Sequence, residues 1–395
     1  MLETEARAWA RGEPGQGVPV VGMVGAGQLA RMSLAAATAL GVRLRLLAAA
    51  PDDAAAQVSA DVTVGAPADR AAVTGFAAGC DVLTFDHELV DLGLLAELEA
   101  AGHTIRPGPA ALALAVDKRH QRAVLGAAGL PVPAHADVTG QADVAAFAAA
   151  HGWPVVLKAA TGGYDGRGVW VLHGPEAPLP PAGPGGRPLL VEEHVGIERE
   201  LAVLVARRPG GQAVVWPLVE TVQVDGICVE LLVPARVEPA VASSATAIGL
   251  AVAETAGVTG VLAVELFLTG SGALVVNELA TRPHNSGHWT IEGARTSQFA
   301  NHLRAVLDLP LGEPALTAPA VATVNLLGGA DGADPRGRAR LAAALAVPGV
   351  AVHLYGKLAR PGRKLGHVTA TGPDPGGALA LARRAAAALV GEDAG

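Results

Sequence analysis

Two glutamates, Glu265 and Glu278, interrupt apolar runs in one short stretch of the chain. The runs Val261–Leu268 and Ala273–Val276 flank the turn Thr269–Gly272, a pattern that predicts a β-hairpin with a carboxylate on each strand or at its exit. An unpaired carboxylate is costly to bury, so two of them on one hairpin need cations nearby. The alternative, two carboxylates facing solvent on an edge strand, fits poorly with their apolar neighbours.

The hairpin also offers hard oxygen ligands, because Asn277 lies beside Glu278. Carboxylate and amide oxygens suit Mg²⁺ that also contacts phosphate oxygens. Polar side chains crowd the segment that follows, namely Arg282, His284, Asn285, Ser286, His288 and Glu292. The hairpin and this segment therefore predict a magnesium and phosphate site.

A lysine precedes a glycine-rich loop within residues 153–172, where the pattern predicts strand, loop, strand. Lys158 ends an apolar run, and the loop Thr161–Gly168 contains four glycines. The loop lacks the Gly-Lys-Ser/Thr ending and the following helix of a Walker P-loop. We expect a hairpin flap that closes over phosphates with backbone amides, while Lys158 neutralises phosphate charge. A plain hairpin turn would need neither the four glycines nor the inward lysine.

An acidic segment follows a predicted strand from Leu189 to Val191. The backbone of Glu193–Val195 could offer N–H and C=O groups to an adenine, and Glu200 could take a ribose hydroxyl. Further strands are expected at 214–219 and 227–233. We expect helices at 243–256 and from about residue 296 to residue 307.

Basic residues predict anion contacts at two places. Lys118 lies in the first turn of a helix, where a cation opposes the helix dipole and a fixed anionic partner is one explanation. A solvated lysine is the alternative. Lys357, Arg360, Arg363 and Lys364 lie between two strand-like runs near the end of the chain. They predict an anion-binding turn, with a solvated basic turn as the alternative.

The beginning of the chain has a strand, a glycine turn and a helix in residues 18–31. Gly25, Gly27 and Ala30 match G-x-G-x-x-A, which alone is a weak indication of a dinucleotide site. Asp52 or Asp53 could mimic the ribose-binding acid of such a site. The βα units that follow are short, however, so a small doubly wound domain to about residue 109 fits better.

The strand at residues 81–85 ends before Asp86, His87 and Glu88. Ligands of open α/β sheets bind at the carboxyl ends of strands, which makes Glu88 a candidate for a polar contact. A solvated loop acid is about as plausible on sequence alone.

Composition limits the class of protein. The chain has 395 residues, 51% of them hydrophobic and 17% charged, and is long enough for two or three domains. A net charge of −8 without a basic block argues against a general nucleic-acid binder. Two distant cysteines and no bilayer-length apolar run favour a cytoplasmic protein that has no contact with membranes. Residues 1–17 are expected to form a loose tail without chemistry.

This order of features resembles the ATP-grasp ligases. Five strings carry a closer resemblance to the 5-(carboxyamino)imidazole ribonucleotide synthase family: GQLARM (27–32), GGYDGRG (162–168), NELATRPHNSGHWTIEGARTSQFANHLRAVLDLPLG (277–312), NLLG (325–328) and HLYGKLARPGRKLGHV (353–368). The resemblance covers about residues 18–390. It implies an α/β (α+β) ATP-grasp fold with a Rossmann-like N-terminal domain and a small β-rich C-terminal domain. We expect these domains at 18–115, 116–312 (flap about 150–215) and 313–395.

The family's activity is the implied function. It uses ATP and Mg²⁺, with Mn²⁺ as a possible substitute, to convert bicarbonate to carboxyphosphate and to carboxylate 5-aminoimidazole ribonucleotide (AIR) in purine biosynthesis. A homodimer is also implied. The rival within the superfamily is a formate-dependent glycinamide ribonucleotide transformylase. A nicotinamide-dependent oxidoreductase or a nucleotide-sensing module is the rival that Gly25, Gly27 and Ala30 would support.

Site roles are carried over by matching strings. The residues implied for ATP are Lys118, Lys158, Gly163, Tyr164, Asp165, Gly166, Arg167, Gly168, Glu192, Glu193, His194, Val195, Glu200, Asn277 and Glu278. Those implied for the metal are Glu265 and Glu278. Those implied for AIR or bicarbonate are Gln28, Glu88, Tyr164, Asp165, Arg167, Arg282, His284, Asn285, Ser286, Lys357, Arg363 and Lys364. The chain departs from the family at Val169, often Gln, and at Gln223, commonly His.

Overall fold

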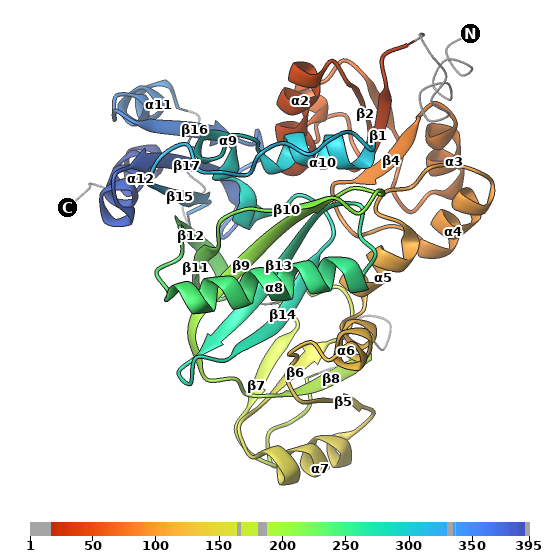
Figure 1. The fold of residues 1–395 in the computed structure, drawn as a ribbon, viewed down its shortest axis with the longest axis vertical. Coiled ribbons are helices and arrows are strands. Elements are labelled where there is room, and N and C mark those ends of the chain that lie inside the picture. Colours follow the sequence, from red (N-terminus) through yellow and green to blue (C-terminus); the bar gives the residue numbers. More distant parts are fainter. Residues whose placement is uncertain (1–16, 164–166, 181–187, 330–334, 336, 392–395) are drawn as a thin grey trace.

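The computed structural model describes residues 17–163, 167–180, 188–329, 335 and 337–391. Figure 1 shows three sheets with helices packed around them. The expected tail at 1–17 lies almost wholly outside the described residues, as do Tyr164, Asp165 and Gly166 of the expected flap. Within the described part, no helix is both long and apolar enough to cross a membrane.

The first sheet is parallel and has the order β3-β2-β1-β4. Its strands are β1 (Val20–Val24), β2 (Arg43–Ala48), β3 (Val62–Val64) and β4 (Val82–Phe85). Its helices are α2 (Gln28–Leu40), η1 (Ala56–Val58), α3 (Arg70–Ala78), α4 (Leu92–Ala100) and α5 (Pro109–Val116). Every residue of β1 and β4 is buried, as expected for a parallel sheet with both faces covered. The predicted small doubly wound unit is confirmed.

The second sheet is small, antiparallel and ordered β5-β8-β6-β7. Its strands are β5 (His135–Val138), β6 (Val155–Ala159), β7 (Val169–Leu172) and β8 (Leu189–Glu193). Helix α6 (Lys118–Ala127) leads into it and α7 (Gln141–His151) packs against it, at the bottom of Figure 1. The predicted arrangement of strand, glycine loop and strand is confirmed by the pairing of β6 with β7.

The third sheet has nine strands in the described residues, in the order β14-β13-β9-β11-β12-β15-β17-β16, with β10 beside β9. These strands are β9 (Ile197–Arg207), β10 (Ala213–Val215), β11 (Val219–Val224), β12 (Ile227–Val233), β13 (Gly260–Thr269), β14 (Leu274–Ala280), β15 (Ala320–Leu327), β16 (Val350–Leu354) and β17 (Lys364–Gly372). Its helices are α8 (Pro239–Thr255), η2 (Asn285–Gly287), α9 (Thr290–Gly293), α10 (Gln298–Val306), α11 (Arg338–Leu345) and α12 (Pro375–Val390).

The predicted hairpin is confirmed, since β13 and β14 pair antiparallel across the turn at 270–273. Several element boundaries differ from expectation, and β14 runs to Ala280 rather than ending at Val276, so Glu278 lies within the strand. Helix α8 begins at Pro239 rather than residue 243, because proline suits the first turn of a helix and Glu238 precedes it in extended conformation. The run predicted at 214–219 is divided between β10 and β11.

Candidate active site

Lys158 lies at the centre of a buried ionic cluster between the second and third sheets. Its Nζ is 2.7 Å from Glu192 Oε2 and 3.0 Å from Asn277 Oδ1. Arg122 on α6 is fully buried and donates to Glu192 Oε1 (2.7 Å) and to the Asn277 carbonyl (2.7 Å). Arg122 therefore fixes both partners of Lys158. A planar guanidinium that donates to two residues through two of its nitrogens holds a geometry that a lysine cannot.

The charges in this cluster shift the pKa values of Glu192 and Lys158. Burial raises the pKa of Glu192, but Arg122 and then Lys158 outweigh it, so the pKa of this carboxyl lies below its usual range. Burial lowers the pKa of Lys158, while Glu192 opposes that shift. The family resemblance implies a contact of Glu192 with ATP. In the structure this residue lies inside β8, and its carboxylate serves the two cations.

Glu265 and Glu278 face each other across the hairpin, as register partners on β13 and β14. Lys118 Nζ is 2.6 Å from Glu278 Oε1, which supplies the fixed anionic partner considered for this lysine. Burial, followed by the negative charges of Glu278 and Glu200, raises the pKa of Glu265 to about 7. Because Glu265 resists ionisation beside Glu278, the surroundings of this pair contain too little positive charge to balance two carboxylates.

That shortage fits a divalent cation. Glu265, Glu278 and the Asn277 amide offer oxygen donors of the kind Mg²⁺ prefers. No group of three or more His, Cys, Asp or Glu that could hold a metal occurs among the residues described. The protein donors would therefore bind the ion together with phosphate oxygens from a ligand, which is the usual arrangement for magnesium at nucleotide sites.

The described ends of the glycine loop adjoin β6, the strand that carries Lys158. Gly168 has a φ of +78°, and its carbonyl accepts a hydrogen bond from the Ala159 amide at 2.8 Å. A Cβ on Gly163 would come within 2.8 Å of the Arg167 carbonyl oxygen. The two glycines thus permit the close backbone turn that a phosphate-covering loop needs. The predicted residues Tyr164, Asp165 and Gly166 are not placed by the described structure.

The residues expected around the adenine and ribose lie on β8, β9 and the connection between them. Glu193 Oε1 accepts from the Ala134 amide (2.9 Å), so its side chain is occupied, while its neighbours His194 and Val195 are at least partly exposed. Burial raises the pKa of Glu200 on β9. These positions agree with the expected adenine and ribose contacts, which stay predictions.

A second polar cluster follows β14. Glu88, after β4, and Arg282 form an ion pair of 2.9 Å, so two predicted candidates from distant parts of the chain come together. The His284 ring lies 2.9 Å from Ser286 Oγ and 3.8 Å from Glu265 Oε1. Burial, then Arg282, lowers the pKa of His284 to about 3, so its ring is neutral and its contact with Glu265 is not an ion pair.

Asn285 lies in this cluster with its side chain amide unsatisfied. It is 8% exposed, and neither its nitrogen nor its oxygen has a hydrogen-bond partner within the described structure. Buried polar groups are normally paired, so an orphaned amide beside other polar groups indicates a place for a ligand.

The predicted cations of the C-terminal part divide in two. Lys357 Nζ reaches across to the N-terminal part and donates to Gln28 Oε1 at 2.6 Å. Lys364, at the start of β17, is close enough to Glu265 to lower the pKa of that carboxyl. Arg363 instead donates to the Leu358 carbonyl (3.2 Å) and lies in a turn with Arg360 that is tied to Gly328.

The glycine turn between β1 and α2 is occupied by the protein itself. The Asp86 carboxylate accepts from the backbone amides of Gly27 and Ala30, the latter at 3.1 Å. A Cβ on Gly27 would collide with this carboxylate. The helix N-terminus that would bind a dinucleotide pyrophosphate therefore carries an internal anion already. This arrangement speaks against the oxidoreductase rival.

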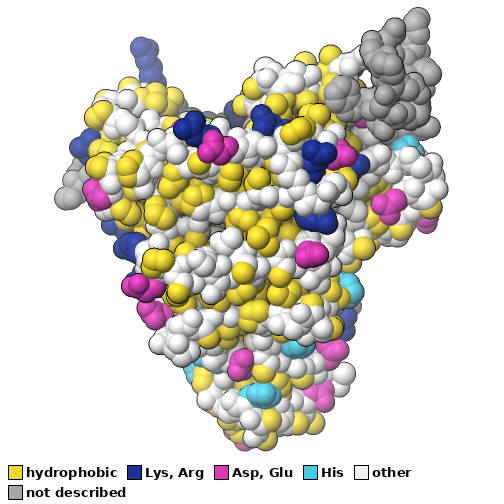
Figure 2. Space-filling view, in the orientation of Figure 1, with side chains coloured by type: hydrophobic (Ala, Val, Ile, Leu, Met, Phe, Trp, Pro, Cys, Tyr) yellow, Lys and Arg dark blue, Asp and Glu magenta, His cyan; other side chains and the backbone are white. Residues whose placement is uncertain are grey.

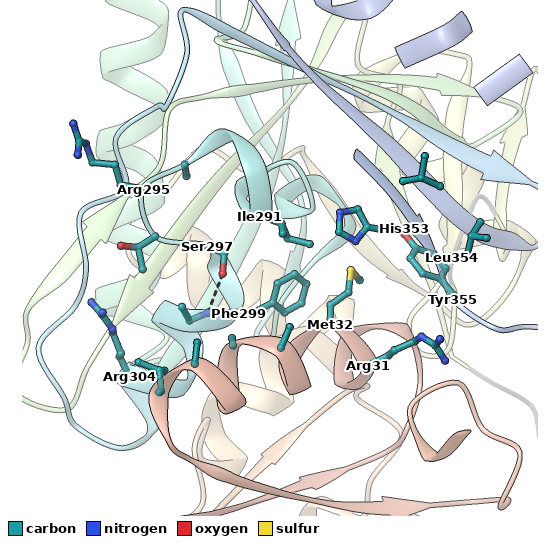
Figure 3. Close-up of a pocket in the computed structure, with 18 residues that line it drawn as sticks. Arg31, Met32, Ile291, Arg295, Ser297, Phe299, Arg304, His353, Leu354 and Tyr355 are labelled. Atoms are coloured by element: carbon teal, nitrogen blue, oxygen red, sulfur yellow. Dashed lines mark hydrogen bonds between the residues drawn. The ribbon is translucent and has the colours of Figure 1, made fainter. Parts of the chain in front are cut away.

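A groove of about 670 Å³ lies beside the site rather than in it. Figure 3 shows Met32 of α2, Ile291 of α9 and Phe299 of α10 along the groove. His353 of β16 and Tyr355, the residue directly after β16, line it as well. Its described lining contains none of the predicted site residues. In Figure 2 the basic side chains of the visible face lie mostly singly or beside acidic ones, without a continuous block.

Sequence reasoning missed three residues that shape the site. Arg122 lies in an amphipathic helix, and nothing in the sequence distinguishes it from an exposed arginine. Asp86 was noted only as the residue that leaves β4, and Gln298, which bonds both the amide and the carbonyl of His284, was not noted at all. In the sequence, the one sign of a special role for these three residues is that each is polar at a position next to apolar residues.

Comparisons with known proteins agree with this geometry. Residues 18–116 match the ribonucleotide synthetase preATP-grasp domain, 123–299 the ATP-grasp domain, and 321–380 the phosphoribosylaminoimidazole carboxylase C-terminal domain. The N5-carboxyaminoimidazole ribonucleotide synthase of Mycobacterium tuberculosis is 50% identical over 361 residues, which cover 90% of this chain and 84% of that protein. The synthase of Corynebacterium ammoniagenes is 45% identical, covering 95% and 92%.

Two solved structures are similar along nearly the whole chain. An N5-carboxyaminoimidazole ribonucleotide synthetase in complex with ADP superposes with a TM-score of 0.85 at 34% identity, covering 93% of this chain and 97% of the other. The N5-carboxyaminoimidazole synthase of Aspergillus clavatus with ADP and 5-aminoimidazole ribonucleotide has a TM-score of 0.86 at 33% identity, covering 94% and 98%.

Proposed function

The chain belongs to the N5-carboxyaminoimidazole ribonucleotide synthase family of ATP-grasp ligases, and from this premise we propose that it carboxylates AIR with bicarbonate and ATP. Bicarbonate attacks the γ-phosphorus to give carboxyphosphate and ADP. The exocyclic amine of AIR then attacks the carboxyphosphate carbon and phosphate leaves. The product is N5-carboxyaminoimidazole ribonucleotide.

One observation carries the proposal: the groups expected to bind the nucleotide and its metal and the groups expected to bind AIR or bicarbonate meet at the β13–β14 hairpin. Glu265 belongs to the first and lies 3.8 Å from His284 of the second. Phosphoryl transfer requires mainly positioning and charge neutralisation, which Lys118 and Lys158 supply from the protein. Mg²⁺, held by Glu265 and Glu278, would neutralise further phosphate charge.

Support for the acceptor side comes from Asn285 and the cations around it. A carboxyphosphate or an imidazole substituent would satisfy the orphaned Asn285 amide. Lys357 and Lys364 supply positive charge for the 5′-phosphate of the ribonucleotide. Tyr164, Asp165 and Arg167 of the flap are proposed, on the resemblance alone, to close over carboxyphosphate, which is labile in water.

The test is the substrate requirement of ADP formation. Purified protein with Mg-ATP should form ADP only when bicarbonate and AIR are both present, in buffer freed of dissolved CO₂. ADP formation that needs glycinamide ribonucleotide and formate would instead establish the rival ligase. ATP turnover indifferent to AIR would contradict the proposal.

Three further expectations are proposed with the function. A homodimer is supported by the family resemblance and is tested by light scattering on a size-exclusion column. A cytoplasmic location is supported by two cysteines that form no disulfide. The domain boundary at 312/313 is supported by the loop between α10 and β15, whereas 115/116 falls in the last turn of α5, just before the non-helical Asp117. Limited proteolysis tests both boundaries.

A further inference from the structure

A buried histidine, His288, lies directly behind the proposed ribonucleotide site. Lys357 Nζ donates to Gln28 Oε1 at 2.6 Å, and Gln28 Nε2 lies 3.3 Å from His288 Nε2. The imidazole thus stands one residue away from a lysine assigned to substrate. His288 is fully buried, and no role in the proposed chemistry accounts for it.

The polarity of this chain of contacts follows from the lysine. An ammonium group only donates, so the oxygen of the Gln28 amide faces Lys357 and the nitrogen faces His288. The facing ring nitrogen of His288 must then accept, which requires a lone pair at Nε2. Flipping the Gln28 amide would set an NH₂ group against the ammonium and lose this hydrogen bond.

The other side of the ring has the same character. Gln298 accepts from the His284 amide through Oε1 (2.9 Å) and donates to the His284 carbonyl through Nε2 (2.7 Å), so its orientation is fixed. The same Nε2 lies 3.3 Å from His288 Nδ1. Both ring nitrogens therefore face amide NH₂ groups, but a neutral imidazole has one lone-pair nitrogen and can accept from only one of them. Gln298 Nε2 already donates to the His284 carbonyl, whereas no acceptor other than His288 faces Gln28 Nε2 in the described structure, so we assign the lone pair to His288 Nε2 and leave Nδ1–H without a hydrogen bond to Gln298. A protonated imidazole would oppose N–H to N–H on both sides.

Aromatic contacts hold the ring plane independently of these hydrogen bonds. His288 stacks on Phe299 and on His367, with centroid distances of 5.9 and 5.0 Å, and meets the edge of Tyr355 at 6.2 Å. Figure 3 shows Phe299 and Tyr355 lining the neighbouring groove. A stacked ring cannot swing away from Gln28, so the acceptor at Nε2 has a fixed place.

We propose that His288 is a positioning residue for the ribonucleotide: its Nε2 lone pair orients the Gln28 amide, and Gln28 holds the Lys357 ammonium at the substrate site. This inference rests on the proposed function, which assigns Lys357 to AIR. It assigns His288 no contact with substrate and no proton transfer. Its effect is confined to the affinity for the ribonucleotide.

Two substitutions separate the two ring nitrogens. His288→Gln can set an amide oxygen near the position of Nε2, whereas His288→Asn sets one near Nδ1. We expect His288→Asn to raise the KM for AIR about five- to tenfold, the size of a lost hydrogen bond, with KM for ATP nearly unchanged. His288→Gln should recover most of the affinity for AIR. Equal KM values for AIR in the two variants would overturn the proposal.

A matched control is another buried histidine with two polar contacts, His302. Its ring contacts Thr84 Oγ1 (2.7 Å) and the Val261 amide (3.1 Å), away from the substrate site. His302→Asn should lower the melting temperature and leave the ratio of the two KM values unchanged. If it changes that ratio as His288→Asn does, the effect on AIR is a general consequence of lost packing and the proposal fails.

A second variant keeps the test decisive if His288→Asn does not fold. Gln28→Leu removes the middle of the chain of contacts near the start of α2 and should reproduce the selective rise in KM for AIR. In a Lys357→Met background, Gln28→Leu should add nothing further. An additive effect, or none in the wild-type background, would contradict the proposal. Failure of the wild-type protein to need AIR would instead refute the proposed function.

Discussion

At the scale of single residues, the site is defined by charges that lack compensation within the protein. Lys158 and Glu192 are matched, with Arg122 as the third member of their cluster. Burial, followed by the charges of Glu278 and Glu200, raises the pKa of Glu265, and Lys364 and Lys118 do not offset that rise. The side-chain amide of Asn285, which has no hydrogen-bond partner in the described structure, is an uncharged group that is likewise unsatisfied. Ligands are expected where the protein has left its own groups unsatisfied.

The carboxyl of Glu265 makes stability depend on pH in a definite direction. Its pKa is raised from 4.5 to about 7 on folding, so the folded protein binds the proton more tightly than the unfolded chain. Its contribution is fully present below pH 4.5 and is lost as the pH rises through about 7. Without metal and nucleotide, Glu265→Gln should therefore melt a few degrees higher than wild type at pH 8 and at the same temperature at pH 4.5.

Differential scanning fluorimetry across that pH range, with a chelator present, measures this difference. Other titrating groups cancel because both proteins carry them. A stabilisation that is equal at both pH values would show that the carboxyl is not strained by its surroundings.

Glu278→Gln tests the neighbouring carboxylate for catalysis. Loss of the charge should weaken the metal site and release Lys118, and turnover should fall at least about a hundredfold. Glu254→Gln, on the exposed face of α8, is a matched control and should retain full activity. Circular dichroism would show that both variants fold. Substantial residual turnover in Glu278→Gln would count against its role as a metal ligand.

At the scale of elements, short patterns along the chain were predictable and contacts across it were not. The β13–β14 hairpin, the β6–β7 pair and α6 all followed from apolar spacing and turn residues close together in sequence. The placement of Asp86 did not, because its partner Gly27 is 59 residues earlier. A G-x-G-x-x-A string specifies a turn, but only the fold decides which anion occupies it.

Asp86 should therefore matter for stability. Asp86→Ala removes the acceptor of two backbone amides at the start of α2, and we expect a loss of about 1–3 kcal/mol in the free energy of unfolding. Asp52→Ala, an exposed residue after β2, serves as control. Urea titration of the two variants measures the difference. Equal stability of both would show that solvent replaces the carboxylate without cost.

At the scale of the whole molecule, the proposed substrate site is assembled from parts that no single domain contains. Gln28 begins α2 and Glu88 follows β4 in the N-terminal part, Arg282 and His284 follow β14, and Lys357 comes from the C-terminal part. The resemblance to a known family could place these residues in one site from sequence. Physical reasoning on the sequence alone could not, because nothing in their spacing brings residues 28 and 357 together.

This assembly predicts how the two substrates respond to a change in the C-terminal part. Lys364→Ala, and likewise Lys357→Ala, should raise the KM for AIR about tenfold or more while changing the KM for ATP much less, since a charged hydrogen bond to phosphate is lost. Steady-state kinetics with each substrate varied in turn measures both values. A larger effect on ATP would refute the proposed phosphate site.

The long third sheet has a mechanical consequence. Hydrogen-bonded strands run without interruption from β14 to β16, and so join the β13–β14 hairpin to the C-terminal strands in one continuous sheet. The small sheet β5-β8-β6-β7 has no ladder to that sheet in the described structure and is joined to it mainly through side chains such as Lys158 and Arg122. Any opening for nucleotide exchange should therefore be a rotation of the small sheet relative to the third sheet, while the residues proposed to bind the ribonucleotide keep their positions.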